Sequence, residues 1–170
     1  MNERIPSFTE LPAPPLRPCL RLDVEVGAPI EIGPAASSFG YGHRRVIPIT
    51  GGRVQCEHHS GAWQGRVLAG GADFQLLVGD RAARLEARYV IETEAGDRIY
   101  VENLALRSGS PDAIARLARG EAVDPSLVYF RCVPRFETSA RSLAWMMERL
   151  FVGTGARRPE RVELRVFELG

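Results

Sequence analysis

The strongest constraint on the fold is a series of short segments in which apolar and polar residues alternate. In residues 20–26, four apolar residues alternate with Arg21, Asp23 and Glu25, which is the pattern of a strand with one buried face. Comparable segments follow at 46–50, 65–69, 73–78, 84–93, 98–106, 127–133 and 161–169. Glycine-rich stretches that favour tight turns separate many of them, namely Gly51-Gly52, Gly70-Gly71, Gly79-Asp80 and Ala95-Gly96-Asp97. This arrangement predicts an antiparallel sheet, folded as a sandwich or a barrel.

Two segments depart from the alternation and predict short helices. Ser110-Pro111-Asp112 supplies a capping residue, a proline suited to the first helical position and an early acid, and Gly120 follows the expected end. From about residue 139 to 151, apolar residues recur with the spacing of one helical face. Five prolines between residues 5 and 18 exclude a helix or a central strand there. We therefore predict a Pro-rich extended arm over residues 1–19 and a single all-β domain over 20–170.

The charged and sulfur-containing residues exclude several functional classes. With 22 basic and 21 acidic residues the formal net charge is only +1. The protein therefore lacks the positive electrostatic potential that attracts nucleic acid or anionic lipid. All the basic residues are arginine, and the absence of lysine excludes Schiff-base chemistry on a lysine and a Walker A loop. Three cysteines without a C-x-x-C motif favour a reducing compartment. No stretch approaches the ~20 apolar residues of a membrane span, so we expect a cytoplasmic protein.

The best candidate for a metal site is Cys56-Glu57-His58-His59, whose four residue types all bind zinc. Adjacent residues on a strand point to opposite faces, so such neighbours rarely share one ion. The third histidine, His43, lies in a glycine-rich stretch and could join only through tertiary contact. We therefore interpret this segment as a polar hairpin tip and predict neither a metal nor another cofactor.

Polar side chains share one face on several consecutive predicted strands. We call this set the polar lattice: Asp73, Gln75, Arg84, Glu86, Arg88, Glu92, Tyr100, Glu102, Tyr129 and Arg131. The simplest interpretation is that the lattice is the solvent face of the sheet, where opposite charges stabilise neighbouring strands modestly. The functional interpretation is a barrel with a polar lumen, where acids, arginines and tyrosines can transfer protons and stabilise an oxyanion.

Several tracts of the sequence resemble the DUF3237 (UPF0311) family: RRVIPITGG at 44–52, GRVLAGGADFQL at 65–76, GEAVDP at 120–125 and PRFET at 134–138. The resemblance covers residue 20 to the C-terminus and implies a small antiparallel β-barrel, similar in fold to the allene oxide cyclase-like barrels. Its polar motif residues are Asp73, Gln75, Arg88, Tyr100, Tyr129, Arg131 and Glu137. Six of these seven belong to the polar lattice, which favours the lumen interpretation.

We therefore expect a cofactor-free enzyme of isomerase, cyclase or lyase type that acts on a small carbonyl-bearing metabolite. In this hypothesis Asp73 or Glu102 is the general acid or base, Arg88 and Arg131 hold an anionic or enolate oxygen, and Tyr100 donates a proton. The expected substrate-binding residues are Trp63, Gln75, Glu86, Tyr129 and Glu137. One alternative is a small-molecule-binding barrel without turnover, and another leaves the lattice on the surface. Association of the protein with further copies of itself, as a homo-oligomer, is also compatible with the sequence. We do not expect it to bind nucleic acid or membranes.

Overall fold

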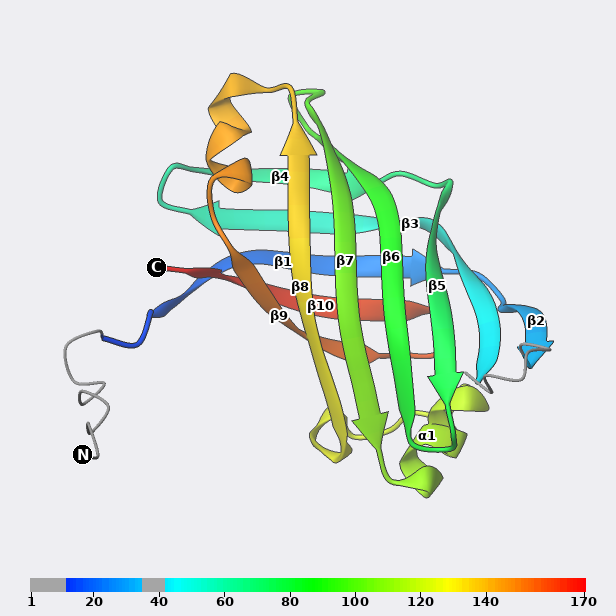
Figure 1. The fold of residues 1–170 in the computed structure, drawn as a ribbon. Coiled ribbons are helices and arrows are strands. Elements are labelled where there is room, and N and C mark those ends of the chain that lie inside the picture. Colours follow the sequence, from blue (N-terminus) through cyan, green and yellow to red (C-terminus); the bar gives the residue numbers. More distant parts are fainter. Residues whose placement is uncertain (1–11, 35–41) are drawn as a thin grey trace, which may run out of the picture.

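The β-strands form one antiparallel sheet that closes on itself into a barrel in the computed structural model, which describes residues 12–34 and 42–170 (Figure 1). The strands are β1 (Leu16–Val26), β2 (Ile30–Pro34), β3 (His43–His58), β4 (Gly61–Val67), β5 (Gly71–Val78), β6 (Ala82–Thr93), β7 (Arg98–Gly109), β8 (Val128–Thr138), β9 (Phe151–Arg157) and β10 (Arg161–Leu169). Three short helices connect them: α1 (Pro111–Ala118), and the 3₁₀ turns η2 (Pro125–Leu127) and η3 (Arg141–Met147). The predicted all-β antiparallel barrel is confirmed.

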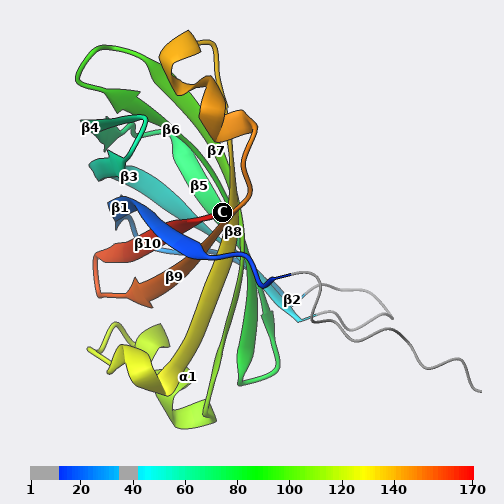
Figure 2. The same cartoon turned by 90° about the vertical axis from the view of Figure 1, so that its left-hand side faces the viewer.

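The barrel closes through β3, which pairs with β1 on one side and with β4 and β5 on the other. β4 and β5 follow one another between β3 and β6, so together they fill one strand position of an eight-stranded barrel. The remaining strands run in the order β6, β7, β8, β9, β10, β1, and β2 adds to β3 at its first half. Figure 2 shows η3 and α1 at opposite ends of this barrel.

β3 is longer than predicted because it runs straight through Gly51-Gly52, which the sequence pattern had indicated as a turn. Gly52 has a φ of +138°, and a Cβ built there would lie 2.2 Å from the carbonyl oxygen of Asp23 on β1. The glycine therefore serves a close approach of two strands rather than a reversal of the chain. The pairing of β1 with β3 shifts register beside it, between Glu25 and Val26.

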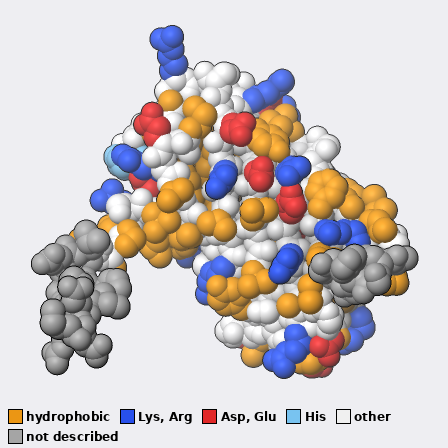
Figure 3. Space-filling view, in the orientation of Figure 1, with side chains coloured by type: hydrophobic (Ala, Val, Ile, Leu, Met, Phe, Trp, Pro, Cys, Tyr) orange, Lys and Arg blue, Asp and Glu red, His pale blue; other side chains and the backbone are white. Residues whose placement is uncertain are grey.

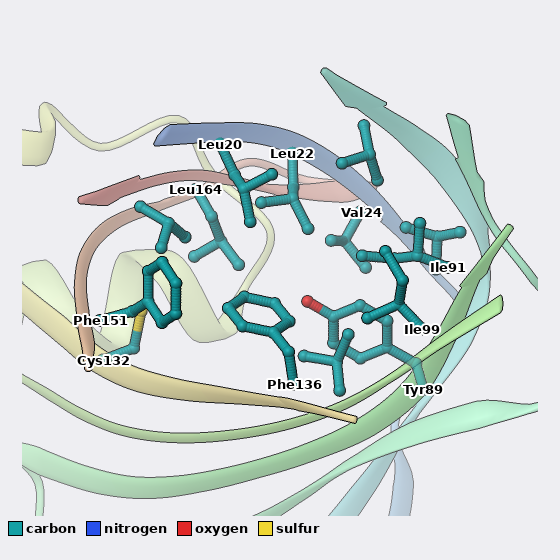
Figure 4. Close-up of a cluster of buried hydrophobic side chains, with 14 of the residues drawn as sticks. Leu20, Leu22, Val24, Tyr89, Ile91, Ile99, Cys132, Phe136, Phe151 and Leu164 are labelled. Atoms are coloured by element: carbon teal, nitrogen blue, oxygen red, sulfur yellow. The ribbon is translucent and has the colours of Figure 1, made fainter. Parts of the chain in front are cut away.

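The apolar face of the strands packs inside the barrel (Figure 4). Ile91, Ile99 and Val101 are completely inaccessible to solvent. Phe136 and Phe151 meet edge to face, with ring centroids 5.1 Å apart. Burial of each such side chain contributes about 1.5–3 kcal/mol. Much of the barrel interior is therefore a packed core and not an open channel.

One of the two predicted helices is confirmed and the other is shorter than expected. α1 begins where predicted, and the Ser110 side chain accepts a hydrogen bond from the Ala113 backbone N–H at 3.2 Å. The expected helix over 139–151 is only the 3₁₀ turn η3, because β9 begins at Phe151 and pairs with β10. None of the helices in the described residues is long and apolar enough to cross a membrane.

The strands β2 and β9 were not predicted. β9 contains two glycines, which weaken any alternating pattern, yet both fit close contacts: a Cβ at Gly153 would meet the Cys132 sulfur at 2.6 Å. The sheet also begins earlier than the expected domain boundary, because β1 starts at Leu16 and pairs with β10 from there. Residues 1–11 of the expected arm lie outside the described part of the chain.

Candidate functional site

Most of the polar lattice lies on the outer surface of the barrel, so the expectation that it lines the lumen is wrong for these residues. The Arg88 and Glu86 side chains are 48% and 42% exposed and pair with each other outside the barrel. The lattice residues Tyr100, Glu102, Tyr129 and Arg131 face outward too, as does Glu137. The physical reason is that the alternate, apolar residues of β6, β7 and β8 fill the core. Trp63 packs against that core.

Two of the predicted residues, Asp73 and Gln75 on β5, do point into the barrel. The Gln75 side-chain amide donates to Asp73 Oδ2, and the Glu86 backbone N–H donates to Asp73 Oδ1 at 3.1 Å. Arg45 Nε on β3 donates to Gln75 Oε1 at 2.9 Å. Gln75 therefore connects the Arg45 guanidinium to the Asp73 carboxylate and fixes the orientation of both.

Neighbouring strands bring four further polar side chains into the lumen: Tyr89 from β6, Asn103 and Arg107 from β7, and Arg157 from β9. Register explains why they meet Asp73: Asp73 lies opposite Ala87 on β6, and Ala87 lies opposite Asn103 on β7. The small side chain of Ala87 leaves space between the carboxylate and the amide. This polar group lies against the core, since core residues such as Leu85 and Phe130 line the same cavity.

A cavity of about 50 Å³ lies beside these side chains inside the barrel. It continues into a wider mouth of about 680 Å³, which the end of α1 borders through Leu117 and Ala118. Gln75, Arg107 and Arg157 line both spaces. A small molecule can therefore enter from the α1 end and place one group beside Asp73.

Burial shifts the proton affinities of the lumen groups. Loss of solvation raises the pKa of Asp73, although its hydrogen bond from Gln75 and the positive charge of Arg107 oppose the shift. Loss of solvation and the nearby Arg45 charge lower the pKa of Arg107 to about 10. Burial also raises the pKa of Tyr89, so its hydroxyl stays protonated at neutral pH. The site thus combines a carboxyl that holds a proton more tightly than usual with fixed hydrogen-bond donors.

Two buried polar atoms at this cavity lack a hydrogen-bond partner within residues 12–34 and 42–170: Arg107 Nε and Asn103 Oδ1. Arg107 and Asn103 are only 4% and 5% exposed. An unsatisfied buried polar group costs about 1–3 kcal/mol, and more when it is charged. Both residues line the cavity, so a ligand there could satisfy a donor and an acceptor at once.

A family model described as "Protein of unknown function (DUF3237)" matches residues 14–169. The chain belongs to this family. A UPF0311 protein of Rhodopseudomonas palustris is 44% identical over 135 residues, which are 79% of this chain and 86% of the relative. A UPF0311 protein of Clostridium acetobutylicum is 36% identical over 87% of this chain and 89% of its own length.

Solved structures agree with the fold of this DUF3237 protein. The Rhodopseudomonas palustris protein superposes with a TM-score of 0.83 at 36% identity, covering 94% of this chain and 99% of the other. A beta-barrel like protein from Acinetobacter baumannii superposes with a TM-score of 0.77 at 34% identity, covering 94% and 98%. An enzyme from Penicillium herquei, 17% identical over the full length of both chains, shares the fold with a TM-score of 0.63.

The sequence pattern missed Arg45, Tyr89, Asn103, Arg107 and Arg157 as site residues of this DUF3237 barrel. A usable signal was present on β7, where Asn103 and Arg107 interrupt the apolar face formed by Ile99, Val101 and Ala105. Polar residues on an otherwise buried face are rarer, and more informative, than polar residues on a solvent face. Arg45 and Arg157 gave no comparable signal, because each lies beside another arginine.

A second polar cluster lies at the opposite end of the barrel, around His58. His58 and His59 come close together because β3 ends at His58, so the alternation of a strand no longer separates them. Glu168 on β10 joins them, and the potential ligand atoms of the three residues lie within 4.8 Å of one another. The expectation that these histidines diverge is therefore wrong.

The hydrogen bonds of His58 do not leave a nitrogen free for a metal. Its Nδ1 accepts from the Ser60 backbone N–H at 3.2 Å, so Nε2 carries the proton and donates to Glu168 Oε2 at 2.9 Å. Arg149 Nε lies 3.2 Å from Glu168 Oε1 and adds a positive charge beside the cluster. Trp145 stacks on the His58 ring with centroids 3.7 Å apart. We interpret this cluster as a structural contact.

Proposed function

We propose that the protein is a cofactor-free enzyme of isomerase, cyclase or lyase type that acts on a small carbonyl-bearing metabolite in the lumen. The observation that carries the proposal is the largely buried Asp73 carboxyl, which shares a cavity with Arg107 Nε, a donor that has no partner in the described part of the chain. Asp73 keeps the general acid or base role expected from the sequence. The oxyanion role moves from Arg88 and Arg131 to Arg107, and the donor role moves from Tyr100 to Tyr89.

The step common to these three reaction types is proton transfer at the carbon next to the carbonyl, and for an isomerisation it is the whole reaction. Asp73 removes a proton from the carbon next to the substrate carbonyl, and the electron pair of that C–H bond forms a C=C bond. The carbonyl oxygen becomes an enolate oxygen, which Arg107 and the Tyr89 hydroxyl stabilise as hydrogen-bond donors. The protonated Asp73 then returns the proton to the same or another atom. The raised pKa of Asp73 favours this role, because it brings the carboxyl closer to neutral pH.

The test is hydrogen–deuterium exchange at the carbon next to the carbonyl, followed by NMR in D₂O with a panel of small ketones and oxo acids. We expect the protein to catalyse exchange in at least one of them. The Asp73→Asn variant should lose roughly 10²–10⁴-fold in rate, because general acid–base catalysis contributes about that much. Glu102→Gln, on the outer surface, is the matched control and should keep the wild-type rate. Equal rates for Asp73→Asn and the wild type would reject the proposal.

The second candidate function is small-molecule binding without turnover. The observation that favours it is a pair of buried atoms, Arg107 Nε and Asn103 Oδ1, that have no hydrogen-bond partner within 12–34 and 42–170; a bound ligand would satisfy them without any reaction. A ligand that raises the melting temperature but undergoes no exchange would support this function instead. The Penicillium herquei barrel is an enzyme, so the fold itself accommodates catalysis.

A cytoplasmic location and a homo-oligomer belong to the proposal as well. The three cysteines of the chain are buried free thiols, which is consistent with a reducing compartment. The outer face of β7 and β8 carries exposed apolar side chains among its charges (Figure 3). These include Leu104, Leu106, Tyr129 and Val133. Such a face is compatible with a second copy of the chain, which sedimentation would detect.

A further inference from the structure

The lumen carries more positive charge than its own acidic residues balance. Arg107 and Arg157 line the inner cavity, where Asp73 is the acidic residue, and Arg45 reaches the same group through Gln75. Glu31 lies at the edge, with an oxygen 3.9 Å from Arg45 Nη1, and half of its side chain is exposed. Among the residues that the structure describes, three guanidinium groups therefore face one largely buried carboxyl group.

The mouth of the cavity repeats this imbalance. Six arginines line it, against three acidic residues, Asp23, Glu25 and Glu160. The excess is local, because the whole chain has a formal net charge of only +1. A mouth of this kind raises the local concentration of small anions and guides them inward.

Two backbone hydrogen bonds fix the orientation of the Arg157 guanidinium at the cavity. Its Nη1 donates to the backbone carbonyl oxygens of Arg158 and Arg161, the latter at 3.2 Å. Arg107 has an Nε without a partner among the described residues, and Asn103 Oδ1 needs a donor. The complementary ligand therefore has an anionic group that accepts hydrogen bonds and a hydroxyl or N–H that donates one.

We propose that the lumen binds a small carboxylic acid, with its carboxylate held by Arg107 and Arg157 and a donor group directed at Asn103 Oδ1. The inner cavity is small, at about 50 Å³, so the group that enters it is small as well. A planar carboxylate meets that limit better than a tetrahedral phosphate. The inference rests on the proposed function for the reacting group, and it then specifies the substrate class as a 2-oxo acid, whose adjacent carboxylate and carbonyl oxygens can both accept hydrogen bonds from the Arg107 guanidinium.

The test uses malonate as the probe and isothermal titration calorimetry with the full chain at constant ionic strength. We expect saturable binding of malonate and no binding of its neutral analogue, malonamide. Arg157→Gln should weaken malonate binding roughly tenfold or more, because a charge-assisted hydrogen bond contributes about 1.5–3 kcal/mol. Arg107→Met is the second variant and should have the same effect. Arg158→Gln is the matched control, since Arg158 pairs with Glu163 instead.

Three results would overturn the inference: equal binding of malonate and malonamide, unchanged malonate affinity in both lumen variants, or tighter binding of inorganic phosphate than of malonate. Its failure can be distinguished from failure of the proposed function. Asp73→Asn should abolish exchange yet retain or tighten malonate binding, because it removes a negative charge from the site. Exchange of neutral ketones without malonate binding would reject the inference alone. Malonate binding without exchange of any compound would reject the catalytic proposal alone.

Discussion

His58 Nε2 donates to Glu168 Oε2 at 2.9 Å, and the two side chains are only 4% and 2% exposed. The contact joins β3 to β10, two strands that are separated by β1 in the barrel. Trp145 of η3 stacks on the histidine ring, so β3, β10 and η3 all pack around His58. A buried hydrogen bond between residues 110 positions apart therefore stabilises this end of the barrel.

Replacement of Glu168 should destabilise the protein. In Glu168→Leu the buried His58 N–H loses its acceptor, which costs about 1–3 kcal/mol. Urea unfolding followed by tryptophan fluorescence measures the loss, since Trp145 stacks on His58. Glu137→Leu on the exposed face of β8 is the control and should change stability by less than about 0.5 kcal/mol. A loss no larger than that of the control would show that the contact does not stabilise the fold.

Asp73 should make stability fall as the pH rises. Its pKa in the folded protein lies above the ordinary value of 3.8, so the folded state binds more protons than the unfolded state in that window. The free energy of unfolding of the wild type therefore decreases, relative to that of Asp73→Asn, as the pH increases from about 3.8 through the raised pKa. Urea titrations of both proteins between pH 3.5 and about 8 give the difference. A difference that does not change with pH, or that changes in the opposite direction, would contradict the raised pKa.

The buried charge of Arg107 should destabilise the protein when no ligand is bound. Its lowered pKa means that its surroundings disfavour the charged form, mainly through burial and the nearby Arg45. Arg107→Met retains an apolar stem of similar length and removes the charge, so we expect an unchanged or higher melting temperature. Differential scanning fluorimetry without added ligand measures it. A marked fall in melting temperature would show that Arg107 is compensated by the protein itself, and that no ligand is needed to balance it.

The stability cost of replacing Arg88 shows whether the polar lattice lines the lumen or, as observed in the structure, lies on the outer surface. A lumen position would make its removal cost about 3–5 kcal/mol, because a buried partner would be left uncompensated. The side chain is instead half exposed beside Glu86 on the surface, so Arg88→Met should cost about 0–1 kcal/mol. Urea unfolding of this variant beside Arg158→Met is sufficient. A loss of several kcal/mol for Arg88→Met alone would restore the earlier interpretation.

The alternating pattern predicted the strands well because period-two alternation is a local property. It could not predict which face is inside, because a strand alternates in the same way whether its polar side meets solvent or the lumen. The polar residues Asp73 and Gln75 of β5 point inward, whereas the polar residues of β6 point outward. The β5–β6 and β6–β7 pairings put Asp73 in register with Ala87 and Asn103, on the face that β6 and β7 turn towards the core. The approach of His58 to Glu168 is non-local, because it joins β3 to β10 across β1.

Gly52 should be one of the least replaceable glycines in the barrel. It combines a φ of +138° with a close approach, since a Cβ would lie 2.2 Å from the Asp23 carbonyl oxygen and 3.0 Å from the Val24 Cα. Gly96 is the matched control: its φ is +86°, but a Cβ there meets nothing within 4 Å. Gly96→Ala should therefore cost about 1–2 kcal/mol from backbone strain alone.

Gly52→Ala adds a steric clash with backbone atoms of β1, which cannot rotate away as a side chain could. We expect a loss of about 3–5 kcal/mol, or a failure to fold, because β3 would have to separate from β1 where the barrel closes. The two variants are compared by urea unfolding, and by far-UV circular dichroism if Gly52→Ala does not unfold cooperatively. Similar losses for both would mean that only backbone conformation matters at Gly52, and that the β1–β3 pairing tolerates an extra methyl group.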